Sequence, residues 1–305
     1  MSDFQNTIDL LGDDVTATTI IDRSIKTYDD NILKRIGNYA FCNAPVLTSV
    51  NFPSVKIIGE HAFENCSVLV NTNIPLATNI GSYAFARCNE LTSVEFLSVT
   101  SIGNYAFQYC RKLTSIYFPS ATTIGERTFD NCSSLTSVRA LLVTKIGVSA
   151  FNSCISLTDI NLPSLTTSGS QGFYGCKKLI NVILPSLTAV AFQMFSGCVA
   201  LTDITLPLAT TIEGYSFTDC TQLANINLPS VTKINGQYSS FLNCKALASV
   251  HLPATPPNLT GAKAFNDVPT TCVFYIPRGS LAAYQSATNW SSLTSTYTFT
   301  EEDRE

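Results

Sequence analysis

A repeat of 22 residues runs through most of this chain of 305 residues and restricts its fold more than any other feature. Nine phenylalanines follow one another at intervals of 22 residues, and two more follow at intervals of 24. They are Phe41, Phe63, Phe85, Phe107, Phe129, Phe151, Phe173, Phe195, Phe217, Phe241 and Phe265. A unit of this length encloses no volume of its own, whereas stacked units bury their apolar side chains as ladders. The repeat therefore predicts a solenoid.

Within the unit, a Cys follows the Phe by three residues in nine repeats, and a Leu follows three residues later. Apolar residues at intervals of three, as in Phe107, Cys110 and Leu113, predict a short helical or 3₁₀ turn. The alternation in Val94-Glu95-Phe96 predicts a very short strand with Glu95 facing outward. A Pro ends the strand in most repeats, because proline has no N–H to donate to a ladder.

These residues resemble a known family. Leu91-x-x-Val94-x-Phe96 and Ile102-Gly103-Asn104-Tyr105-Ala106-Phe107-x-x-Cys110 are similar to the BspA-like, or Treponema pallidum-type, leucine-rich repeat. The resemblance implies an α/β repeat solenoid: a leucine-rich repeat rod with a parallel β-sheet on its concave face, short helical or 3₁₀ turns on its convex face, and a cap at each end. We expect an N-terminal cap over residues 1–24, a solenoid of about ten repeats of 22–24 residues over residues 25–268, and a C-terminal cap with an acidic tail over residues 269–305.

The two ends fit this division. Tyr28, Leu33 and Ile36 occupy repeat positions one period before the first full unit, which predicts a degenerate first turn. Near the other end, residues 272–276 read as a last strand, and Ser280 is placed to cap a short helix over residues 282–287. The charged residues from Thr300 onward are expected to form a mobile tail.

Composition excludes several classes of function. Charged residues make up 13% of the chain, about half the usual share of roughly 25%. The 18 Lys and Arg against 22 Asp and Glu give a net charge of −4, which argues against nucleic acid as a partner. No apolar run approaches the roughly 20 residues of a membrane span, so membrane insertion is not expected. The first residues have neither a basic nor an apolar segment of the kind found in signal peptides.

The residues that carry chemistry are sparse, and they predict no enzyme. The nine repeat cysteines replace a small core residue and are expected to be buried thiols rather than zinc ligands, because no C-x-x-C pair occurs. Cys42 and Cys272 fall outside the ladder, and contacts between chains through them are left open. His61 and His251, the two histidines, lie eight repeats apart and are expected to be solvated surface residues. We therefore expect no catalytic residue, no metal site and no cofactor.

The candidate binding residues lie in the outward row of the strands, which lines the usual binding face of such solenoids. Most of that row is small and polar. Glu95, Tyr117 and Arg139 are three large and chemically distinct side chains on consecutive repeats, and Tyr and Arg are enriched at binding hot spots. Asn161 and the exposed Ile183 complete the predicted site.

Two functions remain open on the sequence. The first is a binding module that recognises a protein or glycan on another cell or particle; the family resemblance implies an adhesin at the cell surface or outside the cell. The second is a structural or receptor-binding component of a phage virion or similar particle, which needs no export signal. In that case residues 1–24 would form the attachment or homo-oligomer end. A monomer would favour the first function, and a trimer or larger ring the second.

Overall fold

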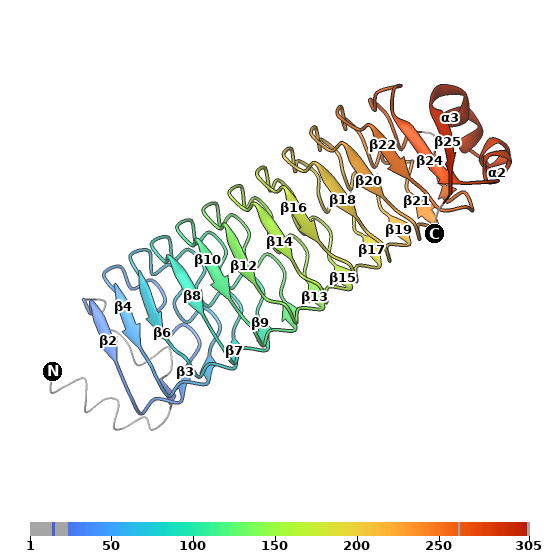
Figure 1. Ribbon diagram of the computed structural model, residues 1–305. Helices are drawn as coiled ribbons and strands as arrows, with labels where there is room; N and C mark the ends of the chain where they lie inside the picture. The colour runs from blue at the N-terminus through green and yellow to red at the C-terminus, as the bar shows by residue number, and fades with distance from the viewer. Residues whose placement is uncertain (1–13, 16–23, 262, 304–305) are drawn as a thin grey trace. The chain divides into compact units, whose positions relative to one another are not determined.

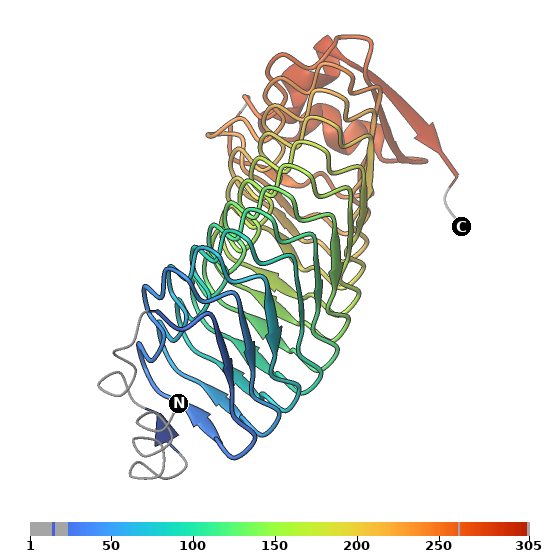
Figure 2. The ribbon, with the colours of Figure 1, turned by 90° about the vertical axis from the view of Figure 1, so that its left-hand side faces the viewer.

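The computed structural model describes residues 14–15, 24–261 and 263–303. The chain divides into two units, the first made of residues 1–143 and 150–155 and the second of residues 144–149 and 156–305. Each unit is a parallel β-solenoid whose turns succeed one another in sequence order (Figures 1 and 2). This confirms the predicted repeat solenoid.

Every repeat carries the predicted three-residue strand. In the first unit these strands are β2 (Thr27–Asp29), β4 (Ser49–Asn51), β6 (Asn71–Asn73), β8 (Ser93–Glu95), β10 (Ser115–Tyr117) and β12 (Ser137–Arg139). In the second unit they are β14 (Asp159–Asn161), β16 (Asn181–Ile183), β18 (Asp203–Thr205), β20 (Asn225–Asn227) and β22 (Ser249–His251). We call the surface formed by their outward side chains the strand face.

Each repeat also carries a second strand of two residues that the sequence analysis missed. In the first unit these strands are β1 (Asp14–Val15), β3 (Arg35–Ile36), β5 (Ile57–Ile58), β7 (Asn79–Ile80), β9 (Ser101–Ile102) and β11 (Thr123–Ile124). In the second unit they are β13 (Lys145–Ile146), β15 (Thr167–Ser168), β17 (Ala189–Val190), β19 (Thr211–Ile212), β21 (Lys233–Ile234) and β23 (Asn258–Leu259). The sequence shows only one buried Ile at this point, too short a signal to predict a strand.

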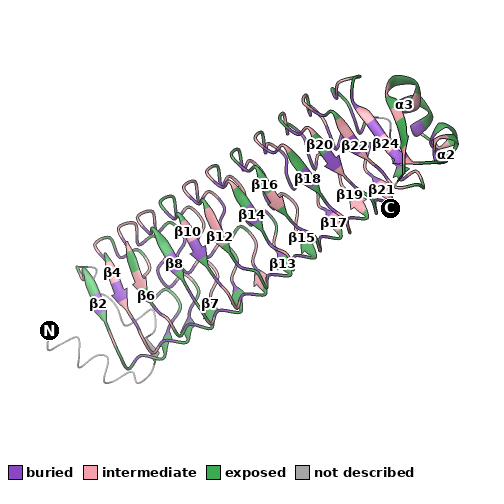
Figure 3. Cartoon of the chain, in the orientation of Figure 1, coloured by how far each residue is buried: buried purple, intermediate pink, exposed green. Residues whose placement is uncertain are grey.

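Neighbouring strands pair in parallel with equivalent residues opposite one another. Tyr117 of β10, for example, lies opposite Glu95 of β8 on one side and Arg139 of β12 on the other. Figure 3 shows the resulting alternation of buried and exposed residues along the strands. Because the register equals the repeat, side chains that share a repeat position become spatial neighbours, about 4.8 Å apart.

The segment predicted as a helical or 3₁₀ turn consists of successive turns closed by i to i+3 hydrogen bonds. The Gln108 N–H donates to the Tyr105 carbonyl and the Cys110 N–H to the Phe107 carbonyl, each at 3.1 Å. Tyr105 and Tyr109 have φ of 60° and 61°, in the left-handed region, and therefore interrupt any continuous helix. The Tyr105 N–H instead donates to the Glu126 carbonyl of the next turn at 2.7 Å. We call the surface of these segments the turn face.

The repeated phenylalanines form the centre of the core. In the first unit, Phe129 is fully buried and stacks between Phe107 and Phe151, with ring centroids 5.5 Å and 5.3 Å away. In the second unit, Phe217 lies in the same way between Phe195 and Phe241, at 5.5 Å and 5.3 Å. The ladders that the repeat predicts are thus present in both units.

The repeat cysteines form a second ladder beside the phenylalanines. All nine are buried, as predicted. Several Sγ atoms donate to the carbonyl oxygen of the Phe 25 residues earlier, as in Cys88 to Phe63 at 3.2 Å and Cys110 to Phe85 at 3.1 Å. Each of these thiols therefore gives a carbonyl oxygen of the preceding turn a hydrogen-bond donor. An aliphatic side chain at the same position could not donate. Burial raises the pKa of the Cys66 thiol to about 12.

Thiol labelling tests this arrangement. Cys42 is half-buried and the other ten cysteines are buried, so native protein is expected to react rapidly with one equivalent of an aromatic disulfide reagent. All eleven cysteines should react in denaturant. The variant Cys42→Ser should lose the rapid equivalent. Rapid reaction of several thiols in the folded chain would contradict a closed core.

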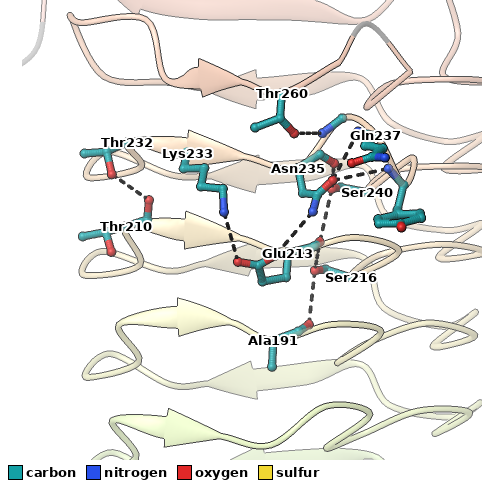
Figure 4. Close-up of polar contacts among 12 residues, drawn as sticks. Ala191, Thr210, Glu213, Ser216, Thr232, Lys233, Asn235, Gln237, Ser240 and Thr260 are labelled. Atoms are coloured by element: carbon teal, nitrogen blue, oxygen red, sulfur yellow. Dashed lines mark hydrogen bonds and ion pairs between the residues drawn. The ribbon is translucent and has the colours of Figure 1, made fainter.

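In the first of the longer repeats, hydrogen bonds hold the extra residues in place, so that the strand register is kept. Asn235 lies at the start of this insertion, and its Oδ1 accepts the N–H groups of Gln237 and Tyr238 at 3.2 Å and 3.3 Å. Its Nδ2 donates to Glu213 of the preceding repeat, which also pairs with Lys233 at 3.6 Å (Figure 4). Parallel pairing then continues from β21 to β23.

A close backbone contact explains one glycine of this insertion. A Cβ on Gly236 would lie 1.7 Å from the carbonyl oxygen of Gly261, so no larger residue fits here without moving the backbone.

The C-terminal end follows the prediction in part. The expected strand is β24 (Val273–Pro277), and the short helix is α2 (Leu281–Ser286). The Ser280 side chain makes no capping bond, and Glu301 Oε1 accepts the Leu281 N–H at 2.9 Å instead. A further helix, α3 (Trp290–Thr296), was not predicted because its Ser- and Thr-rich sequence has weak helical preference.

The prediction of a mobile tail from Thr300 is wrong up to Glu302. Residues Thr298–Glu302 form strand β25, which pairs in parallel with β24. Phe299 stacks on Phe274 with centroids 5.0 Å apart, and this apolar contact holds the charged residues that follow it in the sheet. The first turn is degenerate as predicted, with Tyr28, Leu33 and Ile36 buried. The predicted N-terminal cap, residues 1–24, lies almost entirely outside the described residues.

Candidate binding surface

Glu95, Tyr117 and Arg139 lie side by side on the strand face of the first unit, as the repeat predicts. They end strands β8, β10 and β12 and are opposite one another in the parallel register. All three side chains are exposed, with 39% of Tyr117 accessible. In the described part of the chain none of the three makes a side-chain hydrogen bond or ion pair. A carboxylate, a phenol and a guanidinium are therefore presented together to solvent.

The polar side chains that precede β8 on the same face hydrogen-bond to one another. Asn73 Nδ2 donates to Asn51 Oδ1 at 2.6 Å, and Asn51 Nδ2 donates to Asp29 Oδ1 at 2.7 Å. These groups therefore satisfy one another along the face. This contrast distinguishes the Glu95, Tyr117 and Arg139 trio from Asn51 and Asn73.

Asn161 and Ile183, the other two predicted residues, lie opposite one another on β14 and β16 of the second unit. Ile183 is 52% exposed and Asn161 is also exposed. Beside them, Asp159 accepts hydrogen bonds from Asn181 and Thr158, which lower the pKa of its carboxyl group. The structure therefore divides the predicted site into a trio in the first unit and a pair in the second.

A polar hollow on the strand face of the second unit was not predicted as a site. It has a volume of about 190 Å³ and lies between β18, β20 and β22, where Asp203, Thr205, Asn227 and His251 line it. Asp203 accepts a hydrogen bond from Asn225, which in turn accepts one from Ser249. The sequence contains the polar residues of this cluster at equivalent positions of the two outward rows, but not the hollow itself.

Both histidines stack on tyrosines and pair with glutamates. The prediction that they are simply solvated is therefore wrong. His61 stacks between Tyr39 and Tyr83, with centroids 4.5 Å and 4.7 Å away, and its Nδ1 lies 2.6 Å from Glu64 Oε2. His251 stacks on Tyr275, and its Nδ1 lies 3.0 Å from Glu302 Oε1. Among the residues that the structure describes, no three His, Cys, Asp or Glu side chains gather as metal ligands.

The turn face of the first unit carries an aromatic and basic cluster that the sequence analysis overlooked. Tyr83 and Tyr105 stack with centroids 4.5 Å apart. Beside them, Arg87 and Arg111 both lie against the Tyr109 ring, with Cζ 5.8 Å and 5.9 Å from its centroid. The signal for this cluster in the sequence is the set of turn positions at 22-residue spacing, which parallels that of the strands.

Within the described part of the chain, no helix is long and apolar enough to cross a bilayer.

A known family model agrees with the repeat. The model of the BspA type leucine-rich repeat region, which comprises six copies, matches residues 34–142 and 144–272. No curated protein sequence matches the chain significantly.

Among solved structures, a leucine-rich cell surface protein from Faecalibacterium prausnitzii is 27% identical, with 75% of this chain and 79% of that chain covered and a TM-score of 0.40. A leucine-rich repeat protein from Bacteroides ovatus is 23% identical, with 83% and 92% covered and a TM-score of 0.37. A leucine-rich repeat protein from T. pallidum is 24% identical, with 62% and 78% covered and a TM-score of 0.40.

Proposed function

Since the chain belongs to the BspA-type leucine-rich repeat family, we propose that it is a non-enzymatic, adhesin-type binding protein that recognises a ligand on another cell or particle through its strand face. Leucine-rich repeat proteins generally bind protein ligands. The ligand proposed here is a protein or a glycan.

One observation carries this proposal. Glu95, Tyr117 and Arg139 stand on three adjacent strands with their functional groups exposed and unengaged within the described chain. The strands fix their spacing, so little conformational freedom of the backbone is lost when a ligand binds. An aromatic ring between two opposite charges supports contact with a ligand of mixed polarity.

The proposal predicts that the double variant Tyr117→Ala/Arg139→Ala loses binding while it stays folded. The wild-type chain and the variant would be screened against matrix proteins and a glycan array, and affinity for each hit would be measured by surface plasmon resonance. We expect the variant to bind at least about tenfold more weakly, since truncation of a hot-spot residue costs about 2 kcal/mol or more.

A matched control is Tyr174→Ala/Lys177→Ala, which removes an exposed Tyr and an exposed cation from the second unit. It should bind as the wild type does. Equal binding by the strand-face variant would reject the site. No binding to any protein or glycan, together with a trimer or larger ring in light scattering, would favour the particle component instead.

A further inference from the structure

We propose that the turn face of the first unit holds a second binding site, formed by Asn65, Arg87, Asn89, Tyr109 and Arg111, for a glycan that carries carboxylate or sulfate groups. We call these residues the turn-face site. The inference does not depend on the strand-face proposal, because it concerns other residues on another surface of the repeat.

The backbone fixes the relative positions of these residues. Asn65, Arg87 and Tyr109 occupy the same position in three consecutive repeats, and each has φ close to 60°. The N–H of each donates to a carbonyl of the next repeat, at 2.8 Å for Asn65, 2.7 Å for Arg87 and 2.9 Å for Tyr109. Left-handed residues that form these bonds turn their side chains outward in register, about 4.8 Å from one repeat to the next. The site is therefore built on ordered backbone.

Both guanidinium groups lie against the same Tyr109 ring, and in the described chain neither has a protein counter-ion. Both lie within 6 Å of the Tyr109 ring centroid, where the ring attracts cations. Both arginines are exposed, and in the described chain neither forms an ion pair with a carboxylate. The nearby Glu90 is already paired with Lys112 at 2.6 Å. The positive charge of Arg87 and Arg111 is thus available to an anion.

These residues line a hollow of about 440 Å³. This volume falls within the range of small-molecule sites, which is roughly 300–1,000 Å³. A guanidinium binds carboxylate, sulfate or phosphate through two parallel N–H donors, so each of the two arginines that line the hollow can bind such a group. The hollow therefore fits a ligand with a compact anionic group.

The other lining residues favour a sugar as the carrier of that group. Asn65 Nδ2 donates to Asn43 Oδ1 at 2.8 Å, which leaves its own Oδ1 able to accept from a hydroxyl. Asn89 adds a second amide with no side-chain bond to another described residue, and Tyr109 contributes a phenol at the same wall. Amide and phenol groups around an anion site match the hydroxyl-rich surface of a saccharide.

The surrounding charges disfavour a nucleic acid. Glu64, which pairs with His61, precedes Asn65 in the chain, and the buried Asp130, which accepts from Gln108 Nε2, stands in the repeat that follows Tyr109. Acidic residues therefore bound the basic cluster along the repeat axis, whereas a polymer with a phosphate on every residue needs a long basic track. A glycan with one anionic group every one or two sugars can place that group against the arginines and keep its other charges away from the carboxylates.

The test measures binding of three defined probes to the full chain by isothermal titration calorimetry. The probes are a hyaluronan oligosaccharide, which has carboxylates alone, a chondroitin sulfate oligosaccharide, which adds sulfates, and a neutral dextran oligosaccharide. We expect at least one acidic probe to bind, with an affinity that falls as salt is raised, and dextran not to bind. The stronger of the two acidic probes identifies the anionic group.

Four variants locate the site. Arg87→Gln/Arg111→Gln should weaken binding of the acidic probe about tenfold or more, and Arg87→Lys/Arg111→Lys should weaken it less, because charge remains but the planar fork is lost. The charge-matched control Lys177→Gln/Lys178→Gln, which removes two exposed cations from the second unit, should bind as the wild type does. Tyr117→Ala/Arg139→Ala should also keep full affinity, which separates this site from the strand face.

Thermal unfolding of each variant checks its fold, and all four substituted arginine and lysine side chains are exposed. The proposal is overturned if no acidic probe binds, if Arg87→Gln/Arg111→Gln binds unchanged, or if the lysine control loses as much affinity as the arginine variant. The last result would mean attraction by net charge alone.

Discussion

Phe129→Ala is expected to lower the free energy of unfolding by about 3–5 kcal/mol, the usual cost of truncating a buried Phe. The Phe129 ring is fully buried, stacks on Phe107 and Phe151, and also meets Phe118 with centroids 6.3 Å apart. Alanine would leave a cavity in the middle of a ladder. The rungs on either side cannot close it, because their spacing is fixed by strand pairing.

Denaturant unfolding of the full chain, followed by circular dichroism, measures this loss. Tyr117→Ala is a suitable control in the same unit, since its ring is 39% exposed and its removal should cost less than about 1 kcal/mol. A repeat array can unfold in stages, so more than one transition can appear. The transition whose midpoint shifts in Phe129→Ala is the one in which the first unit unfolds. A loss below about 1 kcal/mol for Phe129→Ala would show that the ladder does not stabilise the fold as described.

Alkaline pH is expected to destabilise the protein steeply. Burial raises the pKa of Cys66 to about 12 and raises the pKa values of Cys88, Cys110 and Cys132 well above their ordinary range. In the unfolded chain these thiols ionise near pH 8.5. The contribution of these thiols to the free energy of unfolding is therefore complete below about pH 8.5. It is lost as the pH rises toward the pKa values of the folded state, because only the unfolded state then releases protons.

Each such thiol lowers stability by about 1.4 kcal/mol per pH unit within that window. The four in the first unit together predict a fall of about 5–6 kcal/mol per pH unit. The measurement is the midpoint of thermal unfolding between pH 7 and 10.5, with a phosphine reductant present to prevent oxidation.

The double variant Cys88→Ala/Cys110→Ala separates the thiols from other groups that titrate at high pH. It should be less stable than the wild type at pH 7, where truncation of buried side chains dominates. It should also lose stability with pH at a shallower slope than the wild type, since two of the buried thiols that ionise only on unfolding are gone. An unchanged slope in this variant would contradict the proposed cause.

The family and the architecture follow from the repeat because its positions are fixed by local chemistry. Phe, Cys and Leu at intervals of three and alternation around residues such as Glu95 predict which side chains are buried and which are exposed. Equal spacing also predicts that Glu95, Tyr117 and Arg139 are neighbours, since any register that stacks the phenylalanines must also stack the outward residues. Residues that share a repeat position in the sequence are therefore neighbours in the structure.

The remaining features depend on contacts between repeats or between distant segments. The two-residue strands exist because the next turn supplies their hydrogen-bond partners, so no single repeat contains their signal. Strand β25 is held by β24 and by the contact of Phe299 with Phe274, which overrides the preference of a charged sequence for solvent.

The sequence by itself determined the solenoid, the ladders of its core and the order of side chains along the strand face, because one repeated pattern imposes one register. Only the tertiary structure decided which polar groups remain available. It showed that Asn51 and Asn73 satisfy each other, whereas Arg87 and Arg111 meet at Tyr109. The physical reason is that hydrogen bonding and charge pairing depend on side-chain positions across repeats, and a composition with a net charge of −4 does not reveal a local concentration of positive charge.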